Sequence, residues 1–210
     1  MIALLQFALI ALTSIFVLVD PIAAVPTFLA MTADSNRAQR RHMAKRAAWT
    51  SFIVLVAFSL AGTFIFQLFG ITLGAFRIAG GLILGLIGLD MLQAKRSPTK
   101  ETPGETEEGA EKEDVGVIPL GIPMLAGPGS ISSVMVLMSQ NQDWLHSAII
   151  VAAIGVTAAL SFVVLAAADR VSSYLHETGI RILTRMMGLL LTAIAVQFVL
   201  NGLKDAGLLR

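Results

Sequence analysis

The sequence predicts an all-α membrane protein: six transmembrane helices that form two inverted three-helix repeats, with helices 1 and 4 broken. Composition is the first of three observations behind this prediction. Of the 210 residues, 56% are hydrophobic and 14% are charged, against about 25% charged in a soluble domain. A chain with a mean hydropathy of +0.80 has too much apolar surface for one buried core, so lipid must cover the rest. The net charge of +1 indicates no nucleic-acid partner.

The second observation is the number of apolar segments. A bilayer crossing takes about 20 mostly apolar residues, and six stretches meet that length: 3–32, 47–69, 71–92, 115–140, 145–168 and 180–202. The first and fourth are the longest, and both contain prolines. The second and third meet at Gly70, which predicts a tight hairpin. The first stretch has no basic region before it, so we expect a membrane helix there and not a signal peptide.

Basic residues predict the orientation. The connections 34–46, 93–114 and 169–185 hold twelve of the fifteen lysines and arginines. Because basic loops face the cytoplasm, both termini are expected on the opposite side. Trp49 and Trp144 flank spans, as interfacial aromatic residues do.

A polar segment divides the chain. Residues 93–114 contain seven carboxylates and two prolines but no large apolar side chain, a composition that cannot bury enough surface to order itself. We expect a flexible cytoplasmic linker between a first three-helix repeat, residues 1–92, and a second, residues 115–210.

The third observation is that the two halves share motifs. A proline pair with a spacing of five residues recurs, and so does an R-x-x-G motif: Pro21 and Pro26 match Pro123 and Pro128, and Arg77 with Gly80 matches Arg185 with Gly188. An odd number of spans per half inverts the second half in the membrane. Matched interrupted helices in inverted repeats are typical of secondary transporters, which bind substrate at the breaks. A duplication whose prolines only kink packed helices remains the alternative.

The second break has the features of an anion site. In LAGPGSISS (125–133), Pro128 suits the first position of a new half-helix, and Gly127 and Gly129 allow close approach to the backbone. Unpaired N–H groups and the positive end of the helix dipole attract anions there, and Ser130 adds a hydroxyl. We therefore expect this half-helix to hold a substrate carboxylate.

Asp20 in the first break has two interpretations. It precedes Pro21 and is able to cap the second half of the helix. Alternatively, its carboxylate faces the substrate cavity and binds an ammonium group or a coupling cation, since a buried ionisable residue in a membrane is a functional candidate. Thr27, next to Pro26, is a further candidate contact. One carboxylate and one helix N-terminus would together suit a small zwitterion.

Two further groups of residues have open roles. Arg77 and Arg185 lie at matching places in the repeats, where they either anchor the helices at the interface or take part in gating or pairing. Glycines 80, 81, 85 and 88 form a small-residue stripe on the third span, and we expect it to allow close helix packing.

Four stretches resemble the MarC family: DPIAAVP, FRIAGGLILGLIGLDML, IPMLAGPGSISSVM and RMMGLLLTAIAVQFVLNGL. That resemblance implies a six-span bacterial inner-membrane protein of the LysE-like transporter group, in which the basic-residue pattern puts both termini on the periplasmic side. It also implies transport of small neutral amino acids such as glycine and alanine. Its motifs map onto Asp20, Pro21, Pro26, Pro123, Gly127, Pro128 and Gly129. Family members often have glycine and asparagine where this chain has Ala23 and Ala24, which implies a different specificity if that asparagine contacts substrate.

Two other functions remain as alternatives. A divalent-metal or other ion carrier needs several converging oxygen ligands, and Asp20 is the one acidic residue that the sequence clearly places inside the membrane. An intramembrane aspartyl hydrolase needs two carboxylates in contact, and Asp20 and Asp90 are expected at different depths. We therefore predict no enzyme, no catalytic residue, no metal site and no cofactor other than a coupling ion, H⁺ or Na⁺. The partners expected are the lipid bilayer and a small-molecule substrate, and a homo-oligomer fits the sequence as well.

Overall fold

The computed structural model describes residues 2–33, 35–93, 116–140 and 143–209, and every regular element in these ranges is helical. Four helices are long and apolar enough to cross a membrane: α3 (Arg37–Phe69), α4 (Leu73–Leu92), α7 (Trp144–Ala166) and the Thr178–Asp205 part of α8 (Ala168–Asp205). The remaining helices are α1 (Ile2–Val19), α2 (Val25–Met31), the π-helix η1 (Leu120–Leu125) and α6 (Pro128–Gln140). The all-α class and the multi-span membrane character are therefore confirmed.

The two longest predicted segments are each divided. The 3–32 segment becomes α1 and α2, and the 115–140 segment becomes η1 and α6. The other four predicted segments each lie within, or nearly within, one continuous helix. Apart from Gln93, the predicted 93–114 linker lies outside the described residues.

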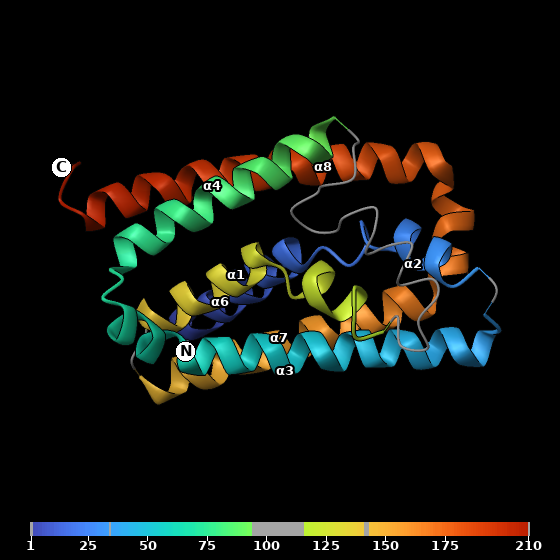
Figure 1. Ribbon diagram of the computed structural model, residues 1–210, viewed down its shortest axis with the longest axis horizontal. Coiled ribbons are helices and arrows are strands. Elements are labelled where there is room, and N and C mark those ends of the chain that lie inside the picture. Colours follow the sequence, from blue (N-terminus) through green and yellow to red (C-terminus); the bar gives the residue numbers. More distant parts are fainter. Residues whose placement is uncertain (1, 34, 94–115, 141–142, 210) are drawn as a thin grey trace.

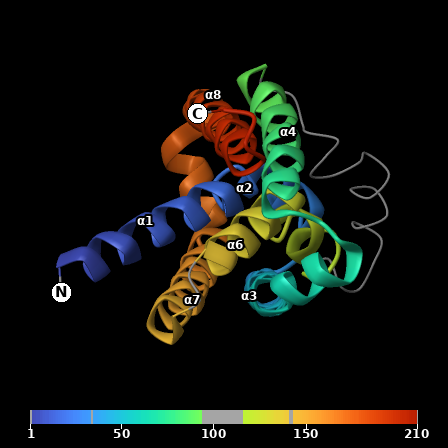
Figure 2. The ribbon, with the colours of Figure 1, turned by 90° about the vertical axis from the view of Figure 1, so that its left-hand side faces the viewer.

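The helices form two groups (Figure 1). Helices α4 and α8 lie side by side, and α1, α3, α6 and α7 pack together below them. The end-on view shows α6 between α4 on one side and α3 and α7 on the other (Figure 2). Helix α6 therefore joins the two groups, and it also carries the second break.

Small residues set the contact between α4 and α8. A methyl group added at each α4 glycine of this face would lie 3.0 Å or less from a backbone oxygen of α8. The three pairs are Gly74 with Gly202, Gly81 with Ala195, and Gly88 with Gly188. Both series repeat every seven residues, which keeps them on one face of each helix. Close packing on α8 is confirmed for Gly81 and Gly88 of the predicted stripe, whereas Gly80 faces Ser132 of α6 and Gly85 meets only an ordinary contact. Helix α8 presents a matching row of small residues.

Two predicted connections are helical. Helix α3 begins ten residues before its apolar segment because Asn36 and Gln39 form a reciprocal capping box. The 169–185 connection belongs to α8, which is interrupted at His176, where φ is 51°. The description of 34–46 and 169–185 as loops is therefore wrong. The basic residues of 37–46 and Arg170 remain outside the apolar segments, whereas Arg181 and Arg185 lie at the start of the Thr178–Asp205 span. The predicted hairpin at Gly70 is tight, with φ of 63° ending α3 three residues before α4 begins.

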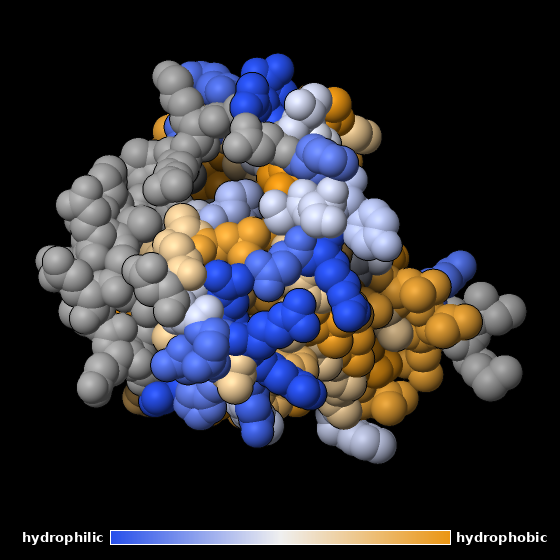
Figure 3. All heavy atoms as spheres, turned by 90° about the vertical axis from the view of Figure 1, so that its right-hand side faces the viewer, coloured by the Kyte–Doolittle hydropathy of each residue, from blue (hydrophilic) through white to orange (hydrophobic). Residues whose placement is uncertain are grey.

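The two ends of the molecule differ in polarity. The N- and C-terminal residues lie toward one end, with the Gly70 turn (Figure 1). The opposite end holds the start of α3 and the end of α7, and hydrophilic residues gather across it (Figure 3). An ion pair of 2.7 Å between Arg40 and Asp169 joins α3 to α8 at this end. The basic first turns of α3 and α8 thus lie at the end away from the termini.

Candidate functional site

The first break begins at a buried acid. Helix α1 ends at Val19, and the N–H of Asp20 donates to the oxygen of Phe16 at 2.9 Å. Asp20 then turns the chain with a left-handed φ of 48°. Its carboxylate accepts a hydrogen bond from the N–H of Ala23 at 3.3 Å, and the residue is only 2% exposed.

The left-handed backbone of Asp20 indicates that its carboxyl group has a functional role. A residue that ends a helix in the left-handed region is usually glycine, because a Cβ costs about 1–2 kcal/mol there. Aspartate and asparagine tolerate the region better than other residues. The chain nevertheless buries a carboxyl group at this point, although burying an ionisable group in a membrane is costly. An outlier of this kind points to function.

The interpretation of Asp20 as the cap of α2 is wrong. The N-cap of α2 is Ala24, and no side chain caps this helix. Asp20 instead holds the turn that precedes Ala24. Of the other residues predicted in this break, Pro21 and Thr27 are buried, whereas Pro26 is exposed.

The second break is longer and more irregular. Ile122, just before Pro123, has an extended backbone inside η1, with φ of −135° and ψ of 126°. A methyl group at Gly127 would lie 2.7 Å from the oxygen of Pro123, so only glycine allows the chain to fold back this closely. Helix α6 begins at Pro128, as predicted, and proline has no N–H to leave unsatisfied.

Ser130 closes the second break. Its hydroxyl lies 3.0 Å from both the Leu125 and the Gly127 oxygens and is able to donate its single hydrogen to either of them. The first backbone bond across the start of α6 runs from the N–H of Ile131 to Gly127, also at 3.0 Å. The N–H groups of Gly129 and Ser130 come before that bond and belong to the unsatisfied first turn of the helix.

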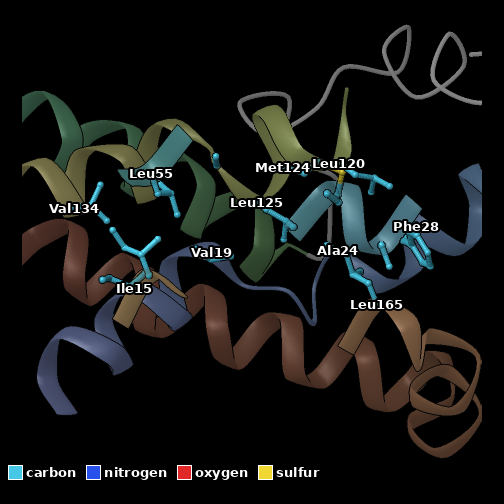
Figure 4. Packing of buried hydrophobic residues seen from close by; sticks show 14 of the residues in the cluster. Ile15, Val19, Ala24, Phe28, Leu55, Leu120, Met124, Leu125, Val134 and Leu165 are labelled. Atoms are coloured by element: carbon cyan, nitrogen blue, oxygen red, sulfur yellow. The ribbon is translucent and has the colours of Figure 1, made fainter. Parts of the chain in front are cut away.

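Both breaks border one buried core (Figure 4). Val19 and Ala24 from the first break, and Leu120, Met124 and Leu125 from the second, belong to the same hydrophobic cluster. The two breaks therefore border the same core, and their convergence on one site stays a prediction.

Helix α4 provides a second link between the breaks. A methyl group at Gly129 would lie 2.5 Å from Cδ2 of Leu84, so this side chain covers the start of α6. Leu84 also belongs to a cluster with Leu18, and Ala23 packs against that cluster. Residues on both sides of Asp20 thus belong to, or pack against, the cluster that includes the side chain over Gly129.

The two arginines of the R-x-x-G motifs lie in different environments. Arg77 is buried and pairs with Asp205 near the end of α8. Arg185 is exposed on α8. Arg77 lies in the first half of α4, near the Gly70 turn.

The sequence analysis did not identify two buried residues that the structure singles out, Leu84 and Thr157. Leu84 is one apolar residue in an apolar helix, and no pattern distinguishes it from its neighbours. Thr157 of α7 is 1% exposed, and its hydroxyl has no hydrogen-bond partner among the described residues. Among all the residues that the structure describes, no group of three or more histidine or acidic residues is placed to hold a metal ion.

Comparison with known proteins gives consistent matches over nearly the whole chain. A family model described as MarC family integral membrane protein matches residues 5–206. A UPF0056 membrane protein of Methanocaldococcus jannaschii is 40% identical over 96% of this chain and 98% of its own. YvbG of Bacillus subtilis is 38% identical over 91% of both chains, and YhcE of Escherichia coli is 35% identical over 90% of this chain and 88% of its own. No solved structure matches significantly.

Proposed function

We propose that this chain, which belongs to the MarC family of integral membrane proteins, is a secondary transporter of small neutral amino acids such as glycine and alanine. The observation that carries the proposal is Asp20, a buried acid in a left-handed turn. It lies in a helix break that shares its hydrophobic core with a second break. Discontinuous helices that meet in this way are where transporters bind substrates and coupling ions.

The two breaks supply complementary charge for a zwitterion. The carboxylate of Asp20 binds the ammonium group or a coupling cation, H⁺ or Na⁺. The N–H groups of Gly129 and Ser130, with the dipole of the 13-residue helix α6, bind the carboxylate. Thr27 is 4% exposed in α2 and contributes a hydroxyl group. The prolines at 21, 26, 123 and 128 keep the backbone from forming continuous helix at both sites.

Leu84 gates the site in this proposal. Its side chain lies over the position where a substrate would approach the first turn of α6 from the side of α4. Leu84 is 1% exposed, so the described conformation is closed on this side. Substrate entry then requires α4, or the Leu84 side chain alone, to move away from Gly129.

The proposed topology has six membrane crossings. Each of the pairs α1 with α2 and η1 with α6 forms one broken crossing, and α3, α4, α7 and α8 form the others. Residues 1–92 and 115–210 are then two inverted repeats joined by the 93–114 linker. The basic end faces the cytoplasm, so both termini face the periplasm or cell exterior across the inner (plasma) membrane.

Ligand binding to the purified protein tests this function. At a ligand concentration of 100 times Kd, the folded state gains about 2.7 kcal/mol, which raises the Tm of a chain of this size by about 5–10 °C. Glycine or alanine should give such a shift with the wild-type protein and with the Asp90→Asn control. The shift should disappear with Asp20→Asn. A set of neutral amino acids that never raises the Tm, or an Asp20→Asn variant that keeps the full shift, would refute the proposal.

A further inference from the structure

A groove of about 830 Å³ lies between α3 and α7, away from the two breaks. Its walls include the aromatic rings of Trp49, Phe52 and Phe162. The α7 wall of the groove includes the small residues Gly155, Ala158 and Ala159, whose short side chains do not fill the space. The volume lies within the range of about 300–1,000 Å³ that is usual for sites that bind small molecules.

Basic side chains line one end of this groove. Arg41, His42 and Lys45 are exposed in the first turns of α3, and the described residues that line the groove include no acidic residue. The ion pairs of the described residues involve neither Arg41 nor Lys45. The guanidinium of Arg41 lies 6.0 Å from the centroid of the Phe162 ring, which holds this charge at the mouth of the apolar part.

The dimensions of the groove match one leaflet of a bilayer. From Arg41 to Phe52, α3 advances about 16 Å, close to half of the hydrocarbon thickness of about 30 Å. Trp49 lies between these residues and is 55% exposed, as expected of an aromatic residue near the interface between headgroups and hydrocarbon. Charge is therefore at headgroup depth, and the aromatic walls are at the depth of the acyl chains.

We propose that the groove between α3 and α7 binds one anionic phospholipid. Its phosphate lies against Arg41 and Lys45, and an acyl chain lies along Phe52 and Phe162. Basic pockets between transmembrane helices recognise anionic headgroups by this combination. A zwitterionic lipid fits the apolar walls equally well but brings a positive group to the basic end. This site is independent of the transport function proposed above.

Lipid titration of the purified full-length protein in a non-ionic detergent tests the proposal. Phosphatidylglycerol should raise the Tm at lower concentration than phosphatidylcholine. Since each basic residue near a membrane surface contributes about a fivefold factor in affinity, Arg41→Gln with Lys45→Gln should weaken phosphatidylglycerol binding by about thirtyfold. The control removes two basic charges from α8, by Arg181→Gln with Arg185→Gln, and should leave binding within about twofold of wild type.

Filling the groove provides the second test. Ala159→Leu places a side chain inside the groove, whereas Ala152→Leu adds the same side chain to an exposed position of α7 outside it. Only Ala159→Leu should lose phosphatidylglycerol binding. Equal binding of the two lipids, or equal losses from the two charge variants, would overturn the proposal. An equal Tm shift with glycerol phosphate would also overturn it, because it would indicate a simple anion site. A change of particle mass with Ala159→Leu would overturn it as well, because it would indicate an interface between copies of the chain.

Discussion

Replacing Gly129 by alanine tests whether α4 closes the start of α6. The new Cβ would lie 2.5 Å from Cδ2 and 3.4 Å from Cγ of Leu84, and the first distance is shorter than real Cβ contacts. Overpacking of this kind costs about 1–3 kcal/mol, while alanine in place of glycine in a helix returns about 1 kcal/mol or less. We expect a net loss of about 1 kcal/mol and a Tm lower by about 2–4 °C.

A double-mutant cycle with Leu84 makes this prediction specific. Leu84→Ala alone should destabilise the protein by about 2–5 kcal/mol, since the side chain is 1% exposed. In the double variant the methyl group of residue 129 occupies space that Leu84 has left, so Gly129→Ala should then be neutral or stabilising. The coupling should be at least about 1 kcal/mol, measured by thermal unfolding of all four proteins in one detergent. Strictly additive effects would refute the contact and with it the role of Leu84 as a gate.

Three further predictions concern packing, the second break and pH. Gly88→Ala should cost about 1–3 kcal/mol, because the new methyl group would lie 2.5 Å from a hydroxyl of α8, whereas Gly85→Ala meets only an ordinary contact at 3.7 Å and should be neutral or stabilising by thermal unfolding. Ser130→Ala should cost about 1–3 kcal/mol by the same measurement, because it removes the hydroxyl that donates to the buried carbonyl group of Leu125, whereas the Gly127 oxygen keeps the N–H of Ile131. Asp143 is the N-cap of α7, and its carboxylate accepts the N–H of Leu145. The hydrogen bond with His146, followed by the bond from Leu145, lowers the pKa of Asp143 below 3.8, so this cap is retained above pH 3.8 and is lost as the pH falls through the lower folded-state pKa. Asp143→Ala should flatten the Tm–pH curve in that acidic range, and an unchanged curve would contradict this.

The sequence alone predicted the features that depend on local chemistry. Apolar length identified four helices, prolines identified the two breaks, and the glycines of α4 identified a close helix contact. The start of α3 was misplaced because the capping box at Asn36 extends the helix through polar residues, which hydropathy does not detect. The α8 side of the glycine contact was missed because Ala195 interrupts its glycines.

Tertiary features of the candidate site required coordinates. The sequence placed Asp20 in a break, but its left-handed backbone and its bond to Ala23 depend on the turn geometry. Leu84 is 45 residues from Gly129 in the chain, and only packing of α4 against α6 brings the two together. The matching R-x-x-G motifs predicted equivalent arginines, yet Arg77 is buried against Asp205 while Arg185 is exposed.

Exchange of radiolabelled glycine or alanine by reconstituted protein is the most direct test of the central claim, that a buried acid in one helix break and a helix start in the other form a transport site. Asp20→Asn keeps the size of the side chain and its tolerance of the left-handed backbone, so folding should change by less than about 1 kcal/mol. We predict exchange by wild-type proteoliposomes and none by Asp20→Asn proteoliposomes that contain the same amount of folded protein. Equal exchange rates for the two proteins would contradict the account.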